Sequence, residues 1–133
     1  MILIDTSAWV EFLRDTKSPV CVRVDTLLNE DIAICEQVHM EVLAGARDER
    51  HLSDLRRLLV RATLIPTAAI DYEEAAVLYR VCRRSGETVR KLMDCLIASI
   101  VIRSGSSLLH CDSDFDVLVR HSALQIDRPR SRP

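Results

Sequence analysis

The sequence predicts an α/β fold, a three-layer α/β/α sandwich with a central, mainly parallel sheet of about five short strands. Short apolar runs alternate along the chain with longer segments in which apolar residues recur every three or four positions. The first pattern is typical of buried strands and the second of amphipathic helices. Strands that alternate with helices indicate a parallel sheet that is covered on both faces.

The predicted strands begin with a short, β-branched-rich run, Ile-Leu-Ile. All of them together cover residues 2–4, 31–35, 64–66, 107–111 and 123–126. The third strand ends at Pro66, which has no backbone N–H to donate to a ladder. We therefore expect this strand near an edge of the sheet.

The predicted helices are recognised by apolar residues at helical spacing. They cover residues 9–13, 19–30, 36–46, 52–59, 70–84, 92–102 and 115–119. Ser18 before Pro19 is a typical helix start, and Gly86 is a typical stop. The segment 92–102 is nearly all apolar and ends before Gly105, so we expect a buried helix there.

Length and composition predict one domain, residues 1–127, followed by an unpacked basic tail at 128–133. With 48% hydrophobic residues, the chain is not of the disordered or fibrous class. Its five cysteines include no C-x-x-C pair, which favours a reduced, cytoplasmic protein over a disulfide framework or a zinc site. No run approaches the ~18–20 apolar residues of a membrane span, and the amino terminus lacks the basic region of a signal peptide.

Charge gives a weaker indication. The formal net charge is −2, so the chain has no strong overall basic field, but nearly all of its 18 basic residues are arginines. The planar guanidinium pairs with phosphate in two-point fashion, which suits a polyanionic substrate. A coding bias of the source genome explains the excess equally well.

Four carboxylates are predicted to meet at one edge of the sheet. Asp5 and Asp112 each follow a predicted strand directly. Glu41 and Asp94 lie in predicted helices and share a helix face with apolar or small residues, so both should point toward packed structure. The strands of a parallel sheet end at one edge, which is where open α/β sheets bind their ligands.

Each of these carboxylates, taken alone, also has a structural explanation. Asp5 and Asp112 could cap the helices that follow them, and Asp94 could interact with a helix dipole. Glu41 alone could be a solvated helix residue. Their joint placement is what favours a functional site.

Such a cluster is costly without a cation. Two like charges ~4 Å apart repel by roughly 4 kcal/mol at an effective dielectric constant near 20, and we expect no Lys or Arg between the acids to neutralise them. A site of oxygen ligands alone suits Mg²⁺ or Mn²⁺. A metal held by carboxylates, with open positions for water and substrate, suits phosphodiester hydrolysis.

Three segments resemble those of PIN-domain ribonucleases, and most of all the VapC-type toxins of toxin–antitoxin pairs. They read ILIDTSAWVEFL from position 2, EQVHMEVLAG from position 36 and VRKLMDCLIASIVIRSGSSLLHCDSDFDVL from position 89. The resemblance covers almost the whole chain and implies a PIN-like fold. The four acids of the family are matched, in order, by Asp5, Glu41, Asp94 and Asp112. Supporting positions of some members are matched by Ser7, Asp114 and Asp116.

The resemblance implies an Mg²⁺-dependent endoribonuclease, with Mn²⁺ able to substitute, that cuts tRNA, rRNA or mRNA. Asp5, Asp94 and Asp112 would be the metal ligands, and Glu41 would hold a water or a second metal. It also implies a homodimer and a small cognate antitoxin that covers the acidic site, with no membrane partner.

Arg90 and Lys91 belong to the densest basic run and lie just before Asp94. They are candidates for guiding RNA phosphates toward the acids, which cannot attract RNA themselves. A solvated helix face is the alternative for such a run.

Two other functions stay open at this point. One is a non-catalytic module of the same fold that binds RNA or protein, although unused clustered carboxylates would lower its stability. The other is a housekeeping RNA-processing nuclease with the same acidic site.

Overall fold

A computed structural model describes residues 1–129 of the chain. Its four strands form one parallel sheet in the order β3-β2-β1-β4. The strands are β1 (Ile2–Ile4), β2 (Ile32–Cys35), β3 (Thr63–Ile65) and β4 (Ser107–Leu109). The strand before Pro66 lies at an edge of the sheet, as the sequence predicted.

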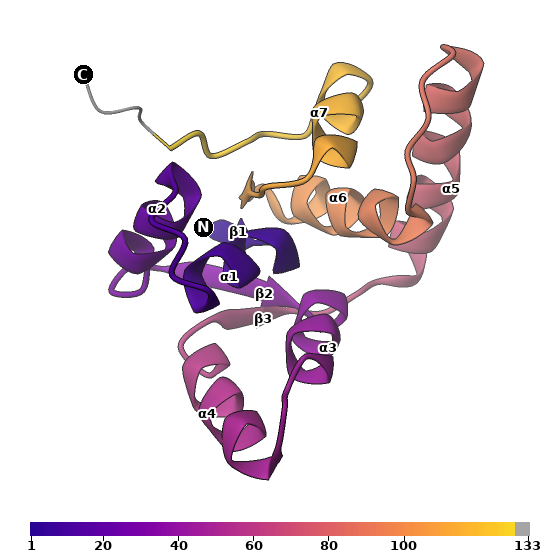
Figure 1. Ribbon diagram of the computed structural model, residues 1–133. Helices are drawn as coiled ribbons and strands as arrows, with labels where there is room; N and C mark the ends of the chain where they lie inside the picture. The colour runs from indigo at the N-terminus through magenta and orange to yellow at the C-terminus, as the bar shows by residue number, and fades with distance from the viewer. Residues whose placement is uncertain (130–133) are drawn as a thin grey trace.

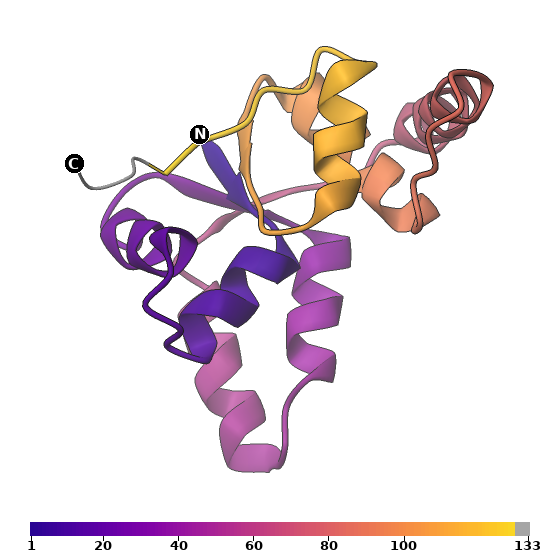
Figure 2. The same cartoon turned by 45° about the horizontal axis from the view of Figure 1, so that its top comes forward.

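Helices cover both faces of the sheet, which confirms the predicted α/β class. They are α1 (Thr6–Leu13), α2 (Pro19–Leu27), α3 (Glu36–Ala44), α4 (Glu49–Leu59), α5 (Ala69–Arg84), α6 (Leu92–Ser104) and α7 (Ser113–Arg120). Figures 1 and 2 show α1 to α4 gathered on one side of the sheet and α5 to α7 on the other. Within these two layers α1 packs against α2 and α3, and α6 packs against α5 and α7.

The central strand, β1, brings distant parts of the chain to one edge. Leu3 lies opposite Ala33 of β2 and Leu108 of β4. Just beyond the strand, the Asp5 N–H donates to the Leu109 carbonyl oxygen at 2.9 Å. The carboxyl ends of β1 and β4 are therefore neighbours, and the segments that follow them start side by side.

The core is centred on α6, whose residues 94–101 are all buried, as the apolar composition of that segment predicted. Trp9 of α1 and Phe115 of α7 are fully buried in the two helical layers. Burial of an aliphatic or aromatic side chain of this size stabilises a fold by about 1.5–3 kcal/mol. Gly105 ends α6 in the left-handed conformation, at φ +69°, where glycine carries no steric penalty.

The predicted fifth strand, 123–126, is wrong. Within the described residues this segment makes only one bridge, Ile126 to Leu108. Its two backbone hydrogen bonds, from the Leu108 N–H to the Gln125 carbonyl at 2.9 Å and from the Asp127 N–H to the Leu108 carbonyl at 2.8 Å, both involve Leu108, so a single residue of β4 pairs with the segment and no ladder forms. The sheet thus has four strands rather than about five.

The end of the chain is described only in part. Residues 130–133 of the predicted basic tail lie outside the described residues, and the division at residue 127 stays a prediction. In the part from residue 1 to residue 129, no helix is long and apolar enough to cross a membrane.

Candidate metal centre

Asp5 is fixed at the junction of β1 and α1. It is the N-cap of α1, and its Oδ2 accepts hydrogen bonds from the Ser7 N–H at 3.0 Å and the Ser7 hydroxyl at 2.6 Å. The Ser7 hydroxyl in turn accepts the Cys111 N–H at 2.9 Å. Ser7 therefore ties the first carboxylate to the loop after β4. Burial raises the pKa of Asp5, and the bonds from Ser7 offset this only in part.

Asp94 lies in the first turn of α6 and is 5% exposed. Its Oδ2 is buried and has no hydrogen-bond partner among the described residues. Burial, followed by a hydrogen bond with the Asp114 carboxylate, raises the pKa of Asp94 to about 8. A buried carboxylate oxygen without a partner is unfavourable in a folded protein, and a cation would satisfy it.

Asp112 is the N-cap of α7, and its two carboxylate oxygens have different hydrogen-bond partners. Its Oδ1 accepts the Asp114 N–H at 2.9 Å and an Arg90 guanidinium N–H at 2.8 Å. Its Oδ2 accepts one bond, from the Lys91 ammonium at 3.0 Å. Burial would raise the pKa of Asp112, but the bonds from the Asp114 N–H and from Lys91 outweigh it and lower the pKa.

Asp114 holds the loop that precedes α6. Its Oδ1 accepts the Arg90 N–H at 3.1 Å, and its Oδ2 accepts the Lys91 N–H at 3.1 Å. Burial is the largest influence on its pKa and raises it, but hydrogen bonds from Asp94 and these two amides leave the pKa below the ordinary value. Each of Asp94, Asp112 and Asp114 offers one oxygen within 4.8 Å of the others.

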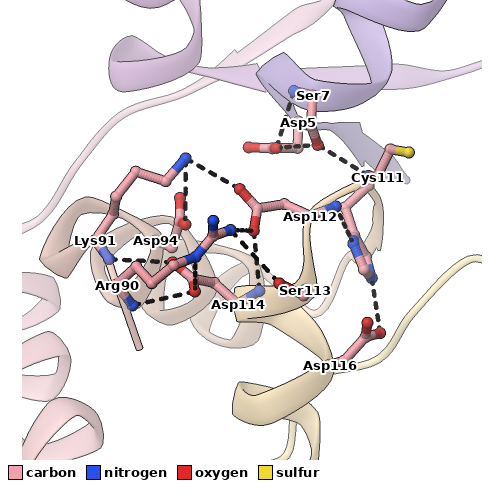
Figure 3. Close-up of polar contacts among 11 residues, drawn as sticks. Asp5, Ser7, Arg90, Lys91, Asp94, Cys111, Asp112, Ser113, Asp114 and Asp116 are labelled. Carbon is pink, nitrogen blue, oxygen red and sulfur yellow. Dashed lines mark hydrogen bonds and ion pairs between the residues drawn. The ribbon is translucent and has the colours of Figure 1, made fainter. Parts of the chain in front are cut away.

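Asp116 lies apart from these acids. Its side chain is 60% exposed, and its Oδ1 lies 3.8 Å from Nε2 of His110. Figure 3 shows it on the far side of the loop, pointing away from Asp94. Asp116 and Asp114 are two residues apart at the start of a helix, so their side chains point in different directions.

Glu41, in α3, is half-buried. Burial and the negative charge of Asp5 raise its pKa, and Thr6, the residue after Asp5, lines the same groove as Glu41. The groove, of about 360 Å³, lies between α1, α3 and α4, and its walls include Val10, Leu13 and Leu55. This groove was not foreseen from the sequence, because its wall is formed by three helices whose packing the sequence does not specify.

One expectation about charge is wrong: two basic residues do neutralise the acids. Arg90 pairs with Asp112 at 2.8 Å and Asp114 at 3.2 Å. Lys91 pairs with Asp112 at 3.0 Å and lies 3.8 Å from Asp94. The three-residue spacing of Lys91 and Asp94 was visible in the sequence, but the pairing with Asp112 depends on the fold.

The donors suit a hard divalent cation. Figure 3 shows Asp5, Asp94 and Asp112 facing a common space at the carboxyl edge of the sheet. All three offer carboxylate oxygens, which Mg²⁺ and Mn²⁺ prefer, and Asp94 contributes the oxygen that has no hydrogen-bond partner. A cation bound there would also reduce the repulsion among these carboxylates.

Comparison with known proteins identifies the family. Residues 2–120 match the PIN domain family. The chain is 50% identical over 129 residues to ribonuclease VapC11 of Mycobacterium tuberculosis, covering 94% of this chain and 96% of that protein.

Two solved structures have a similar fold. VapBC2 from Rickettsia felis, bound to a promoter DNA fragment, matches with a TM-score of 0.74 at 22% identity, over 96% of this chain and 98% of that one. A toxin–antitoxin complex from Klebsiella pneumoniae matches with a TM-score of 0.70 at 20% identity, over 86% and 90%.

Proposed function

The chain belongs to the PIN-domain family and, within it, to the VapC ribonucleases, and on this premise we propose that it is a metal-dependent endoribonuclease that acts as the toxin of a toxin–antitoxin pair. The family resemblance drawn from the sequence is confirmed. The main support for a metal-dependent activity is the buried Oδ2 of Asp94, which lies near Asp112 and has no hydrogen-bond partner within residues 1–129. We propose that the activity depends on a metal ion and that the substrate is RNA.

The proposed metal ligands are Asp5, Asp94 and Asp112, and the proposed ion is Mg²⁺, with Mn²⁺ as a substitute. Such a cation, when bound, would lower the pKa of an attacking water and neutralise charge on the scissile phosphate. Ser7 orients Asp5 through two hydrogen bonds to one carboxylate oxygen. Asp114 orients the loop at residues 90–91 through its backbone amides.

Glu41 is proposed as the fourth acid, on the Asp5 side of the site. Burial and the negative charge of Asp5 raise the pKa of Glu41, which suits a carboxyl group that shares protons with a nearby water. Arg90 and Lys91 are proposed to contact RNA phosphates at the rim, since both side chains are more than half exposed.

The activity is tested by incubating total cellular RNA with the purified, partner-free protein in Mg²⁺, in Mn²⁺ and in EDTA. We expect discrete fragments with either metal and none in EDTA. Asp94→Asn should reduce cleavage by about 10²–10³-fold, the range for loss of a group that stabilises a transition state. The matched control is Asp54→Asn, at an exposed position of α4, and it should cleave like the wild type.

Two results would contradict the proposal. Absence of cleavage by folded, metal-loaded protein would favour the non-catalytic binding module. Cleavage that persists in Asp94→Asn would mean that the acids described above do not form the active site.

The role as a toxin is tested in cells. Expression should arrest growth of a bacterial host, and Asp94→Asn should restore growth at equal protein level. Normal growth with an active nuclease would favour a housekeeping RNA-processing enzyme.

The antitoxin is proposed to cover the acidic site by way of the groove that Glu41 lines. The apolar wall of the groove suits an amphipathic helix. Its basic rim, formed by Arg14 and Arg47, favours acidic residues on that helix. The relationship to VapBC2 of Rickettsia felis supports a partner of this kind.

A further inference from the structure

The Lys91 ammonium lies between two carboxylates that are proposed to bind the metal. Its Nζ is 3.0 Å from Asp112 Oδ2 and 3.8 Å from Asp94 Oδ2, and Figure 3 shows it between the two side chains. Within residues 1–129, the Asp112 Oδ2 has no hydrogen bond other than the one from Lys91, and the Asp94 Oδ2 has none. Lys91 therefore contacts the two oxygens that are left for a cation.

Arg90 differs from Lys91 in this respect. It contacts Oδ1 of Asp112 and Oδ1 of Asp114. The Asp112 Oδ1 is the atom that caps α7 by accepting the Asp114 N–H, so the Arg90 contact holds this N-cap in place. Arg90 can keep these contacts while a cation binds the other oxygen of Asp112.

A divalent cation and the Lys91 ammonium cannot share this place. Mg²⁺ binds carboxylate oxygens at about 2.0–2.1 Å, and two positive charges so close together repel strongly. The Lys91 side chain is 55% exposed and has a flexible four-carbon stem. It can turn into solvent while the Lys91 N–H stays bonded to Asp114.

We propose that Lys91 is a resident counter-cation of the metal centre: without metal it neutralises Asp112 and fills the place beside Asp94, it is displaced by the divalent ion, and it then binds a phosphate of the substrate. This inference rests on the metal-dependent function proposed above. The metal thus frees a basic group at the rim at the moment when the site becomes able to cleave. Without metal, the charge of Lys91 is used within the protein and adds little to binding of a polyanion.

The displacement is tested by titrating Mn²⁺ into metal-free protein in a calorimeter at one pH. Lys91→Gln removes the competing charge and should bind Mn²⁺ about tenfold more tightly than the wild type. Lys91→Arg keeps a positive charge and should bind no more tightly than the wild type. Arg61→Gln removes an exposed charge at the end of α4 and should leave the affinity unchanged.

The outcomes separate this inference from the proposed function. If the wild type binds Mn²⁺ and Lys91→Gln binds it equally or more weakly, Lys91 is not displaced and the inference is wrong, while the metal site stands. If neither protein binds Mn²⁺, the metal site and the inference both fail.

The phosphate contact is tested by fluorescence anisotropy with a mixed-sequence 2′-O-methyl RNA, checked on a gel to be intact. In saturating Mn²⁺, Lys91→Gln should reduce the slope of log affinity against log salt by about 0.7, which corresponds to one phosphate on a single strand. In EDTA the two proteins should have the same slope. An equal slope in Mn²⁺, or an equal loss with and without metal, would overturn the second half of the inference.

Discussion

The Asp94 carboxyl group makes the metal-free protein sensitive to pH. Its pKa is raised from 3.8 to about 8, first by burial and then by the hydrogen bond with Asp114. Between these two values the folded chain holds a proton that the unfolded chain has released. The free energy of unfolding therefore falls as pH rises through this window, by up to about 1.4 kcal/mol per pH unit from this group.

Asp94→Asn should remove this dependence. In EDTA we expect the variant to be more stable than the wild type at pH 7 by up to about 4 kcal/mol, because a buried amide is neutral without taking up a proton on folding. The difference should grow from pH 5 to pH 8 and be small at pH 4. Thermal melts across this range measure it, with Asp54→Asn as the control. Equal pH profiles for Asp94→Asn and the wild type would show that Asp94 ionises normally.

The sequence predicted where the acids lie better than it predicted the contacts that each one makes. Asp5 and Asp112 follow buried strands, so their place at the sheet edge could be read from the alternation of strands and helices. The different positions of Asp114 and Asp116 could not be read from the sequence. The helix was expected to start at residue 115, but it starts at Ser113. That shift puts both residues in the first turn, one buried and one exposed.

At the level of elements, the alternating pattern identified all four strands and their parallel arrangement. It failed at residues 123–126, because the length of a ladder depends on how many residues of the partner strand come within hydrogen-bonding reach. Here Leu108 of β4 makes a single bridge to the segment, at Ile126. An apolar run alone does not show how far two backbones will run side by side.

The contact between Asp127 and Arg23 should stabilise the C-terminal segment on β4. In the wild type, the N–H of residue 127 donates to the Leu108 carbonyl at 2.8 Å. Asp127→Asn weakens the ion pair with Arg23, so we expect this N–H to exchange with solvent about tenfold faster in the variant. Global stability should fall by no more than about 1 kcal/mol, as is usual for a partly exposed ion pair. Hydrogen exchange followed by NMR measures the first effect. The control is Asp25→Asn, at an exposed position of α2, the helix that contains Arg23. Equal exchange rates of the residue 127 N–H in the two variants would show that the ion pair does not stabilise the segment.

The molecule as a whole has an apolar surface that suits a second copy of the chain. Tyr72 of α5 and Leu92 and Met93 of α6 line it, and Tyr72 and Leu92 are more than half exposed. Along α5, Glu73 and Glu74 lie near the start, while Arg80, Arg83 and Arg84 lie near the end. Two α5 helices packed antiparallel would place opposite charges together, so we propose a homodimer through this surface.

Tyr72→Glu should disrupt the dimer, because it places a charge in the apolar surface. By size-exclusion chromatography with light scattering at micromolar concentration, we expect a monomer for this variant and a dimer for the wild type. Val60→Glu, at an exposed apolar position at the end of α4, is the control and should remain dimeric. A monomeric wild type, or an unchanged dimer in Tyr72→Glu, would exclude this interface.

Carboxylates from separate parts of the chain are proposed to form one metal site at the carboxyl edge of the sheet. The most direct test is a crystal structure with Mn²⁺, in which anomalous scattering locates the ion. We expect a peak at about 2.0–2.3 Å from Oδ2 of both Asp94 and Asp112, close to Asp5, with the Lys91 ammonium moved away. A fully occupied Mn²⁺ elsewhere would rule out this metal site, and unchanged contacts of Lys91 with these acids beside a bound Mn²⁺ would rule out its displacement.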